Sequence, residues 1–527
     1  MSRVEVLIVG GGVTGAGVAR DLSLRGVDVM LLEKSDFSAG ATGRCHGMLH
    51  SGGRYAVKDS ESAAECAKES TILKRIAGYC IEDTGGLFVA LEEDDPNFLD
   101  RFLRGCRDTG VRAKEIMPAE ARSLEPCLSK KIQNSAEVED ASVDPFALTI
   151  GNVEDARAAG ADIRNYCSIQ EFSLGDGRIQ EAIFEDLRTG TRQRVRPEIV
   201  LNAGGAWADH IASLAGIHIP MEIDKGILVV LNGRIVNGLV NRLRMPSDGD
   251  IIVPNHSASI VGTTSEKVDD PENTAVSGSD VHRLLAEATR MVPDVAMARA
   301  VRAYAGIRPL PGGKSGREAS RTFRVIDHAE EGVENFVSTV GGKLTTYRLM
   351  AEKASDLVMR KLGKSGACHT ALEPISPPMP AGQVKDLLSF PLIRMTRKYG
   401  KDYRDVVKGC ATSLRGKEIL CSCEEVLRGE IEHFASSSDV TRISDLMRRT
   451  RAGMGYCQAG MCSFAIASVM IDHSDRDPLE LIGEFLEERW RGVEPVLFGG
   501  QLRQEVFNRY VHDGVYRLEP LLRGEGR

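Results

Sequence analysis

The chain has 527 residues, of which 42% are hydrophobic and 27% are charged, and its formal net charge is −8. This length predicts two or three domains, and the composition is ordinary for a globular protein. The negative net charge gives no overall attraction to nucleic acid, and no apolar run approaches the roughly 18 residues that a membrane-spanning helix needs.

The chain begins with a pattern typical of a strand, a helix and a second strand. Residues 4–9 are nearly all apolar, as in a strand that is covered on both faces, and residues 16–24 are expected to form a helix. Gly26 ends that helix, and residues 27–32 form a second buried strand that ends at Glu33. Because the first apolar run is short, β-branched and followed by glycines instead of a cleavage site, we expect a buried strand, not a signal peptide, and a cytoplasmic protein.

Three glycines join the first strand to the helix in the pattern G-x-G-x-x-G: Gly10, Gly12 and Gly15. Such glycines let the backbone turn tightly and approach a pyrophosphate, whose charge the helix N-terminus favours. Glu33 stands 23 positions after Gly10, where an acid would bond the ribose hydroxyls of an adenosine. The alternative is a glycine-rich turn in an unrelated α/β protein. The turn itself does not distinguish FAD from NAD, but the late return of the sheet in the sequence favours FAD.

The remainder of the chain contains a long loop, short strands and a proline-rich break. Residues 35–53 are rich in Gly, Ser, Ala and His and are expected to form an extended loop, and a strand is expected over 198–202. Short β-type runs between residues 220 and 340, among them DIIVPN, FRVIDH and NFVSTV, predict a mostly antiparallel sheet layer. A helix is expected over 343–362, and four prolines between 374 and 380 predict a linker.

These elements predict an α/β fold in which a Rossmann-like FAD-binding domain is combined with an antiparallel-sheet substrate domain and followed by a mainly helical domain with a cysteine motif. The predicted boundaries are 1–365 for the interleaved FAD-binding and substrate domains, 366–385 for the proline-rich linker, 386–475 for the helical domain with the cysteine motif, and 476–527 for a C-terminal helical extension.

Four of the twelve cysteines form two tight pairs: one residue separates Cys421 from Cys423, and four residues separate Cys457 from Cys462. Four thiolates suit a [2Fe-2S] cluster or a zinc ion. The single-residue gap counts against zinc, whose structural sites use longer spacings, and ordinary free thiols are the third alternative. Residues 463–471 are expected to form a helix whose N-terminus faces an anionic cluster. We therefore interpret the four cysteines as ligands of a [2Fe-2S] cluster.

Four longer motifs resemble those of a known enzyme family. They are SAGATGRCHGMLHSGGRYAVKD over 38–59, VLNAGGAWAD over 200–209, AYAGIRPL over 303–310 and VGGKLTTYR over 340–348. Together they resemble FAD-dependent glycerol-3-phosphate dehydrogenases, and the resemblance covers residues 1 to about 365. Because a C-terminal domain with paired cysteines is also present, the sequence is most similar to the A subunits of the anaerobic, membrane-associated, three-subunit type.

The resemblance implies where the substrate binds. It places Arg54, Tyr55, Arg308 and Lys343 around an anionic substrate and the flavin, and arginine can hold a phosphate or carboxylate through two parallel hydrogen bonds. His50 is a candidate for the base that takes the hydroxyl proton. Alternatively, His50 only binds backbone or flavin, and Arg308 or Lys343 stabilises the alkoxide. The catalytic candidates are therefore His50, Arg308 and Lys343.

The residues that the resemblance and the glycine turn imply for FAD binding come from many parts of the chain. They are Gly10, Gly12, Val13, Thr14, Gly15, Glu33, Lys34, Thr42, Gly43, Arg44, His46, Leu49, His50, Ala203, Gly204, Trp207, Gly306, Gly342, Leu344 and Thr345. Thr345 is also expected to cap the helix that follows it, whose N-terminus would face the pyrimidine end of the flavin. The basic run over 448–451 is expected to be a solvated face, and the alternative is contact with an acidic partner or anionic lipid.

The predicted function is the oxidation of sn-glycerol 3-phosphate to dihydroxyacetone phosphate, with hydride passing to FAD N5 and electrons leaving through the [2Fe-2S] centre to a quinone-linked partner. The resemblance implies partner subunits that carry electrons to the membrane, so the protein is expected in the cytoplasm or on the inner face of the cell membrane. Two alternatives remain. One is an FAD-dependent dehydrogenase of 2-hydroxy acids, amino acids or amines with the same fold, and the other is an electron-transfer subunit without its own active site.

Overall fold

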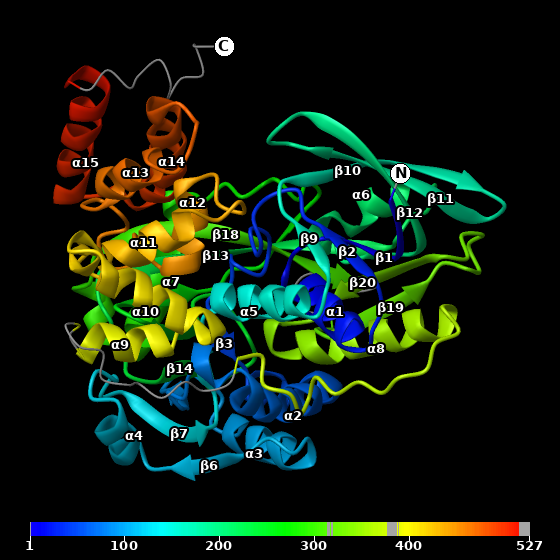
Figure 1. Ribbon diagram of the computed structural model, residues 1–527. Helices are drawn as coiled ribbons and strands as arrows, with labels where there is room; N and C mark the ends of the chain where they lie inside the picture. Colours follow the sequence, from blue (N-terminus) through cyan, green and yellow to red (C-terminus); the bar gives the residue numbers. More distant parts are fainter. Residues whose placement is uncertain (1, 313–316, 318–319, 377–386, 388, 516–527) are drawn as a thin grey trace.

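The computed structural model describes residues 2–312, 317, 320–376, 387 and 389–515 (Figure 1). Its first sheet combines the N-terminal strands with strands from the middle of the chain. These strands are β1 (Ser2–Val9), β2 (Val29–Leu32), β9 (Asp162–Arg164), β10 (Cys167–Gly175), β11 (Arg178–Asp186), β12 (Thr191–Asn202), β19 (Phe323–Asp327) and β20 (Phe336–Gly341). β1 lies between β12 and β2 and runs parallel to both, and β2 is parallel to β9. The Rossmann-like unit predicted from the N-terminal sequence is therefore confirmed.

The two faces of β1 are buried against different layers, as its continuous apolar sequence predicts. Val6 and Ile8 pack in one core with α1, α5 and α8, whereas Leu7 and Val9 pack in another core with β10, β11 and α6. The helices of this part of the chain are α1 (Val13–Leu24), α2 (Ser60–Ile76), α3 (Phe98–Asp108), α4 (Pro118–Leu124), α5 (Pro145–Ala158), α6 (Ala208–Ser213), α7 (Gly278–Met291) and α8 (Tyr347–Lys361).

The second sheet forms the substrate domain and is mostly antiparallel, as predicted. Its strands are β5 (Gly86–Leu91), β6 (Ala113–Ile116), β7 (Ile132–Val138), β13 (Met221–Leu231), β14 (Leu239–Arg242), β15 (Ile251–Asn255), β16 (Ala258–Gly262), β17 (Glu266–Val268) and β18 (Ala300–Pro311). A small third sheet joins β3 (Met48–Leu49), β4 (Ile81–Glu82) and β8 (Ala141–Val143). The loop expected over 35–53 thus contains one short strand.

Two of the runs that the sequence assigned to the substrate domain belong to the first sheet instead. β19 and β20 pair with each other, and β20 runs parallel to β12, with Val337 opposite Leu201. The sequence assignment was wrong because an apolar β-branched run does not reveal which sheet it joins. In the substrate sheet, β5, β6 and β7 contribute strands from a stretch of sequence in which no strand had been recognised.

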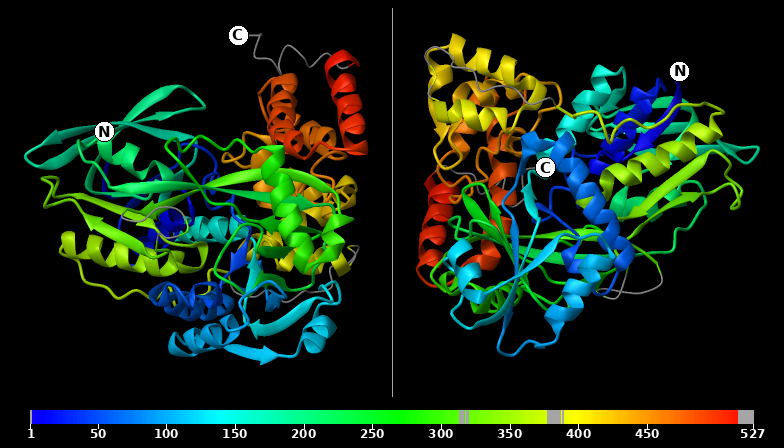
Figure 2. Two further views of the ribbon diagram at one scale, coloured as in Figure 1. Left: turned by 180° about the vertical axis from the view of Figure 1, so that it is seen from behind. Right: turned by 90° about the horizontal axis from the view of Figure 1, so that it is seen from below.

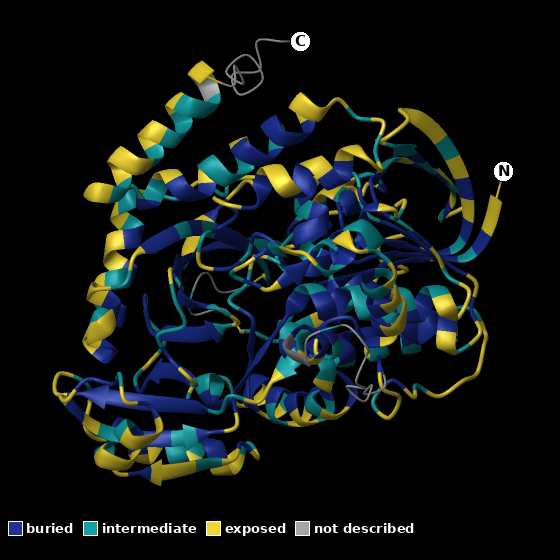
Figure 3. Cartoon of the chain, turned by 60° about the vertical axis from the view of Figure 1, so that its left-hand side comes forward, coloured by how far each residue is buried: buried dark blue, intermediate teal, exposed yellow. Residues whose placement is uncertain are grey.

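Helices from α9 onward form a separate group at one end of the molecule, which we call the cysteine domain (residues 389–515; Figures 1 and 2). Its elements are α9 (Ser389–Thr396), α10 (Tyr403–Thr412), β21 (Ile419–Cys421), β22 (Val426–Leu427), α11 (Arg428–Ala435), α12 (Ile443–Thr450), α13 (Ser463–Ile471), α14 (Pro478–Val493) and α15 (Gly500–Tyr510). One apolar core extends from Leu392 on α9 to Leu486 on α14. α15 contributes no buried residue and lies on the outside (Figure 3).

The segment between the two parts of the chain is only partly described. Of the predicted linker over 366–385, residues from 377 on lie outside the described residues, and the part up to Ser376 has no helix or strand. Ile375 is fully buried, and its N–H donates to Ile76 O at 2.9 Å, so this part packs along the first domain. The domain boundaries remain predictions. Within the described ranges, no helix is both long enough and apolar enough to cross a membrane.

Candidate active site and cysteine site

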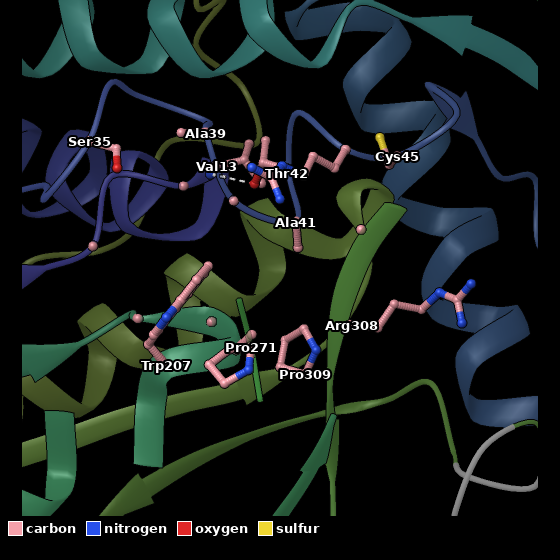
Figure 4. A pocket seen from close by; sticks show the side chains of 18 of the residues that line it. Val13, Ser35, Ala39, Ala41, Thr42, Cys45, Trp207, Pro271, Arg308 and Pro309 are labelled. Atoms are coloured by element: carbon pink, nitrogen blue, oxygen red, sulfur yellow. Dashed lines mark hydrogen bonds between the residues drawn. The ribbon is translucent and has the colours of Figure 1, made fainter. Parts of the chain in front are cut away.

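A cavity of about 2120 Å³ lies at the carboxyl ends of β1, β2, β12 and β20. In open α/β sheets this edge is where dinucleotides bind. The volume exceeds the roughly 300–1,000 Å³ of sites for single small molecules, so there is room for a long cofactor and a substrate. Figure 4 shows Ser35 and Arg308 on opposite sides of the view, with Thr42 and Trp207 between them.

Most of the residues predicted to bind FAD or substrate line this one cavity. They are Gly10, Gly12, Val13, Thr14, Glu33, Lys34, Thr42, Arg44, His46, His50, Arg54, Tyr55, Ala203, Gly204, Trp207, Gly306, Arg308, Gly342, Lys343 and Leu344. Four of the predicted residues do not line the cavity: Gly15, Gly43, Leu49 and Thr345. Residues more than 300 positions apart in the sequence are thus brought to one site.

The three glycines of the turn have different structural roles. Gly10 has a φ of +115°, and a Cβ on it would lie 2.5 Å from Ala203 O, so strand β12 approaches the turn closely. A Cβ on Gly15 would lie 1.9 Å from Gly10 O, which means that Gly15 lets the helix pack against the turn. Gly12 faces the cavity: the nearest atom to its Cβ position is Thr42 Oγ1 at 3.2 Å. α1 therefore begins at Val13 with its N-terminus directed at the cavity, three residues earlier than predicted.

Glu33 holds the loop after β2 in place. Its carboxylate accepts hydrogen bonds from Gly11 N at 2.6 Å and Ser35 N at 2.8 Å. Burial raises the pKa of the Glu33 carboxyl. The acid thus stands at the position that the motif predicts, beside the glycine turn and in the cavity wall.

Arg54 and Arg308 face the cavity next to buried acids. Arg308 forms an ion pair with Asp224, which is 1% exposed, and its Nη2 donates to Thr263 Oγ1 at 2.9 Å. Arg54 Nη2 lies 3.9 Å from Asp250 Oδ2, too far for a hydrogen bond. Burial lowers the pKa of both guanidinium groups, and that of Arg308 falls to about 10. Asp224 therefore fixes Arg308, Asp250 offers its charge to Arg54, and both arginines remain in the wall of the cavity.

A third arginine of the cavity wall, Arg317, was missed by sequence reasoning. It forms an ion pair with Asp248, and its Nη2 donates to Thr263 O at 3.1 Å. The signal that identified Arg54 and Arg308, a glycine within two positions of the arginine, is also present in GGKSGRE. Thr263 therefore contacts two cationic side chains of the site, Arg308 and Arg317.

His50, Tyr55 and Lys343 lie close together in the cavity. The rings of His50 and Tyr55 are 5.3 Å apart, and Lys343 Nζ lies 5.1 Å from the centre of the Tyr55 ring. Lys343 Nζ also donates to Arg321 O at 2.6 Å. Burial, together with the positive charges of the site, lowers the pKa of His50 well below its usual range, so its ring is neutral at neutral pH. Among the described residues, no atom bonds His50 Nδ1.

The predicted cap at Thr345 is wrong. Thr345 lies in a short 3₁₀ turn, Leu344–Thr346, that precedes α8, and its Oγ1 accepts a hydrogen bond from His50 N at 3.0 Å. The hydroxyl that would cap the helix is thus used to hold the backbone of the histidine loop. The prediction failed because this loop is almost 300 positions away in the sequence.

The four cysteine sulfurs form a row of contacts. Cys421 Sγ lies 3.8 Å from Cys423 Sγ, and Cys423 Sγ lies 3.6 Å from Cys457 Sγ. The Cys462 thiol donates a hydrogen bond to Cys421 Sγ. Cys462 is also the N-cap of α13, the helix predicted to start there. Among the described residues, no three His, Cys, Asp or Glu side chains surround one point closely enough for a single ion. A [2Fe-2S] cluster binds two cysteine sulfurs at each iron, so a row of four sulfurs suits it better than it suits a single ion.

Glycines surround the sulfurs, and backbone N–H groups donate to them. Gly453 N donates to Cys421 Sγ at 3.4 Å, and a Cβ on Gly455 would lie 2.7 Å from Cys423 Sγ. A hydrogen bond from Cys423, with help from backbone N–H groups, lowers the pKa of Cys457 to about 6. Thiolates are the form that binds metal, and N–H groups stabilise a negatively charged cluster. The four residues therefore fit a [2Fe-2S] centre.

The basic run over 448–451 is not a solvated face, so that prediction was wrong. Arg449 is 5% exposed and donates two hydrogen bonds to Asp36, at 2.9 and 3.0 Å. Arg451 is 4% exposed and its Nε donates to Glu424 at 2.9 Å. Arg448 Nη1 donates to Asp36 Oδ2 at 3.2 Å. The run therefore joins the cysteine domain to the cavity wall. The prediction failed because Asp36, the acid that Arg449 binds, is 413 positions away in the sequence.

Family comparisons agree with this two-part organisation. The family described as FAD dependent oxidoreductase matches residues 5–357, and the BFD-like [2Fe-2S] binding domain matches residues 419–472. The chain is therefore a flavin-dependent oxidoreductase with an attached iron–sulfur domain, and its cofactors are FAD and a [2Fe-2S] cluster.

The similar proteins narrow this class. The chain is 40% identical to the A subunit of the anaerobic glycerol-3-phosphate dehydrogenase of Escherichia coli K12, over 98% of this chain and 97% of that protein. It is 37% identical to the A1 subunit of the corresponding enzyme from Haloferax volcanii, over 96% and 90%. The chain belongs to the family of the anaerobic glycerol-3-phosphate dehydrogenase A subunits. A glycerol-3-phosphate dehydrogenase structure from Bacillus halodurans, complexed with FAD, has the same fold, with a TM-score of 0.72, 21% identity and coverage of 94% and 96%.

Proposed function

We propose that the chain oxidises sn-glycerol 3-phosphate to dihydroxyacetone phosphate and passes the electrons through its [2Fe-2S] centre to a partner subunit. The observation that carries this proposal is the presence of Arg54, Arg308 and Arg317 in one cavity wall that also contains the dinucleotide turn. Several guanidinium groups suit a phosphate dianion better than the single carboxylate of a hydroxy acid or amino acid. The names of the relatives at 37–40% identity agree with this substrate.

The side chains of the cavity have separate tasks in the proposed reaction. Bound FAD supplies a hydride acceptor at N5, and the [2Fe-2S] cluster supplies a one-electron acceptor. Arg308 and Arg54 hold the substrate phosphate, and the ion pair with Asp224 keeps Arg308 in position. Lys343 lies beside Tyr55 in the same wall and stabilises negative charge that develops on the substrate oxygen.

His50 is the proposed acceptor of the proton from the C2 hydroxyl. A base must be unprotonated and must have a free lone pair. The lowered pKa of His50 keeps its ring neutral, and the residue lines the cavity. The hydrogen bond from His50 N to Thr345 Oγ1 fixes the backbone of this residue. If His50 only contacts backbone or flavin, the His50→Gln variant described in the Discussion will keep the wild-type rate.

The proposed partner accepts electrons from the cysteine site and connects the chain to quinone at the membrane. Met461 and Tyr456, which directly precede the ligands Cys462 and Cys457, are 84% and 45% exposed. α15, which has no buried residue, carries Phe507 at 61% and Tyr510 at 68% exposure. We take these exposed apolar side chains as the surface that the partner covers. A partner that covers them would bring its redox centre next to the cluster ligands.

One experiment separates this function from its alternatives. The purified holoprotein is mixed anaerobically with glycerol 3-phosphate, and the loss of the visible flavin absorbance is followed. Rapid reduction supports the proposal. Reduction by 2-hydroxy acids or amino acids but not by glycerol 3-phosphate contradicts it and favours another dehydrogenase of this fold. If none of these substrates reduces the flavin while dithionite does, the chain is an electron-transfer subunit without its own active site.

A further inference from the structure

The cysteine domain forms part of the wall of the FAD cavity. Its contribution comes from α12, from α14 and from the residues just before each helix. The residues are Thr441, Arg442, Ile443, Ser444, Arg448, Arg476, Glu480, Leu481, Glu484, Phe485, Glu487, Glu488 and Arg491. The FAD dependent oxidoreductase match ends at residue 357, so none of these residues belongs to the matched FAD-binding region.

This wall lies at the end of the cavity where the ADP half of FAD belongs. A pyrophosphate at the N-terminus of α1 places the adenosine ribose beside Glu33, at the end of β2. The adenine then continues past Ser35, on the side of the cavity away from Arg308 (Figure 4). Asp36 is the next residue, and it is the acid that binds Arg448 and Arg449 of α12. The cysteine domain is thus anchored three residues beyond the ribose acid.

Arg448 is the cationic side chain of α12 that reaches this end of the cavity. Its Nη1 donates to Asp36 Oδ2 at 3.2 Å and to Asp445 Oδ1 at 3.1 Å. Within the described residues, its Nε and Nη2 make no hydrogen bond, and its side chain is 16% exposed. Arg44, on the flavin loop, lines the same cavity. Two guanidinium groups from two domains therefore flank one end of the site.

The position of Arg448 is fixed by its neighbours. Arg449, the next residue, holds Asp36 through two hydrogen bonds and is 5% exposed. Tyr166 OH donates to the carboxylate of Asp445, one turn before Arg448, at 2.8 and 2.9 Å. A side chain held in this way contributes to binding with little loss of entropy, because its geometry is set before the ligand arrives.

We propose that Arg448 of the cysteine domain binds the ADP half of FAD, so that the flavin site is complete only when the two domains are joined through Asp36. Nε and Nη2 would donate to the phosphates or the ribose, which are the hydrogen-bond acceptors of that half. The inference rests on FAD binding, which the family match shows, and not on the identity of the substrate.

The test measures cofactor binding by the full-length chain without turnover. FAD is removed, and the dissociation constants of FAD and of ADP are measured by fluorescence titration and by competition for wild type, Arg448→Ala, Arg448→Lys and Arg428→Ala. Arg428 is the matched control, because it lies in the same domain, pairs with Glu432 at 2.7 Å and does not line the cavity. Iron content and thermal unfolding show that each variant is folded and retains its cluster.

In Arg448→Ala we expect the dissociation constants of FAD and ADP to rise by the same factor, at least about tenfold, since a hydrogen bond to a charged group is lost. Arg448→Lys is expected to lie between wild type and the alanine variant, and Arg428→Ala to equal wild type. Unchanged FAD affinity in Arg448→Ala overturns the proposal. So does weaker FAD binding with unchanged ADP binding, which places the effect at the flavin end, or an equal loss in Arg428→Ala. Each of these outcomes leaves the proposed substrate untouched.

Discussion

Arg451 donates a hydrogen bond through Nη2 to Asn255 Oδ1 at 2.7 Å, which links the end of α12 to the end of β15 across 196 positions of sequence. The same guanidinium binds Glu424 through Nε, and Glu424 directly follows Cys423. Asn255 Nδ2 in turn lies near Gly47, in the loop between His46 and Met48. One buried arginine therefore holds the cysteine loop against the substrate sheet and close to the flavin loop.

Removing Arg451 is expected to destabilise the protein strongly. In Arg451→Ala, Glu424 is left 3% exposed without its main partner, and breaking such a buried pair costs about 3–5 kcal/mol in the free energy of unfolding. Arg3→Ala is the control, because its pair with Glu198 is 79% and 42% exposed and contributes less than about 1 kcal/mol. Urea unfolding of both variants measures the difference. Equal stability of the two variants would contradict the role of Arg451.

Arg308 is expected to act mainly on substrate binding. Arg308→Ala removes one cation from the phosphate site and leaves the buried Asp224 without its partner. We expect a loss of about 2–5 kcal/mol in kcat/KM, chiefly through a higher KM for glycerol 3-phosphate. Arg308→Lys keeps the charge but not the two parallel donors, so it is expected to recover only part of the loss. Steady-state kinetics with an artificial acceptor test this. A normal KM in Arg308→Ala would rule out the phosphate contact.

The N-terminal half of the site could be predicted because its signals are local. The strand, the glycines and Glu33 follow one another within 33 residues, and each has a physical reason that is visible in the sequence. The four cysteines were recognisable from their spacing alone. Arg54 and Arg308 were found through glycines within two positions of them and through the resemblance, and both line the cavity.

What failed depended on contacts between distant parts of the chain. The membership of β20 in the first sheet is decided by its pairing with β12 and not by its own composition. The hydrogen bond from His50 N to Thr345 joins positions almost 300 residues apart. The ion pair between Arg449 and Asp36 joins positions more than 400 residues apart. A single sequence gives the residue types of such pairs but not their neighbours.

The stability of the FAD-free protein is expected to depend on the protonation of His46. Burial, with the charges of Arg54 and Arg308, lowers the pKa of His46 to about 3 in the folded state, against about 6.5 when unfolded. Between these values the unfolded state binds more protons. This contribution to stability is therefore complete above about pH 6.5 and decreases as the pH falls, by up to about 1.4 kcal/mol per pH unit.

The measurement compares the free energies of unfolding of wild type and His46→Gln at about pH 7.5 and 5.5. The wild type is expected to lose more stability than the variant on acidification. Glutamine keeps a polar side chain of similar size but does not titrate in this range. Identical losses in both proteins would show that His46 is not buried in its neutral form.

His50 is expected to affect the chemical step more than binding. His50→Gln removes the base but keeps a polar side chain, so kcat is expected to fall by about 10²–10⁴-fold while KM changes little. Because the pKa of His50 lies well below its usual value, no loss of kcat is expected from its protonation near pH 6.5 in wild type. Flavin reduction in single-turnover experiments measures the step directly. A variant with the wild-type rate would leave His50 with backbone and flavin contacts only.

The exposed methionine beside the cluster is expected to matter only when the partner is present. Met461→Asp adds a charge to a side chain that is 84% exposed, so neither folding nor flavin reduction by substrate is expected to change. Electron transfer to quinone in the reconstituted complex is expected to decrease, because the partner must desolvate the new carboxylate. Met117→Asp, at a 69% exposed position before α4, is the control. Equal quinone reduction by both variants would exclude this surface as the contact.

Alanine substitutions at two glycines of the turn are expected to affect different properties, protein stability at Gly15 and FAD binding at Gly12. In Gly15→Ala the new Cβ would lie 1.9 Å from Gly10 O, so the helix must move away from the strand, and the FAD-free protein is expected to lose about 1–3 kcal/mol or more. In Gly12→Ala the Cβ meets only Thr42 Oγ1 at 3.2 Å and points into the cavity, so stability changes little but the pyrophosphate is displaced. Urea unfolding without FAD, followed by FAD titration, separates the two effects. A Gly15→Ala protein of normal stability would contradict the close packing of the helix on the turn. A Gly12→Ala protein with normal FAD affinity would show that the pyrophosphate does not lie against this turn as inferred.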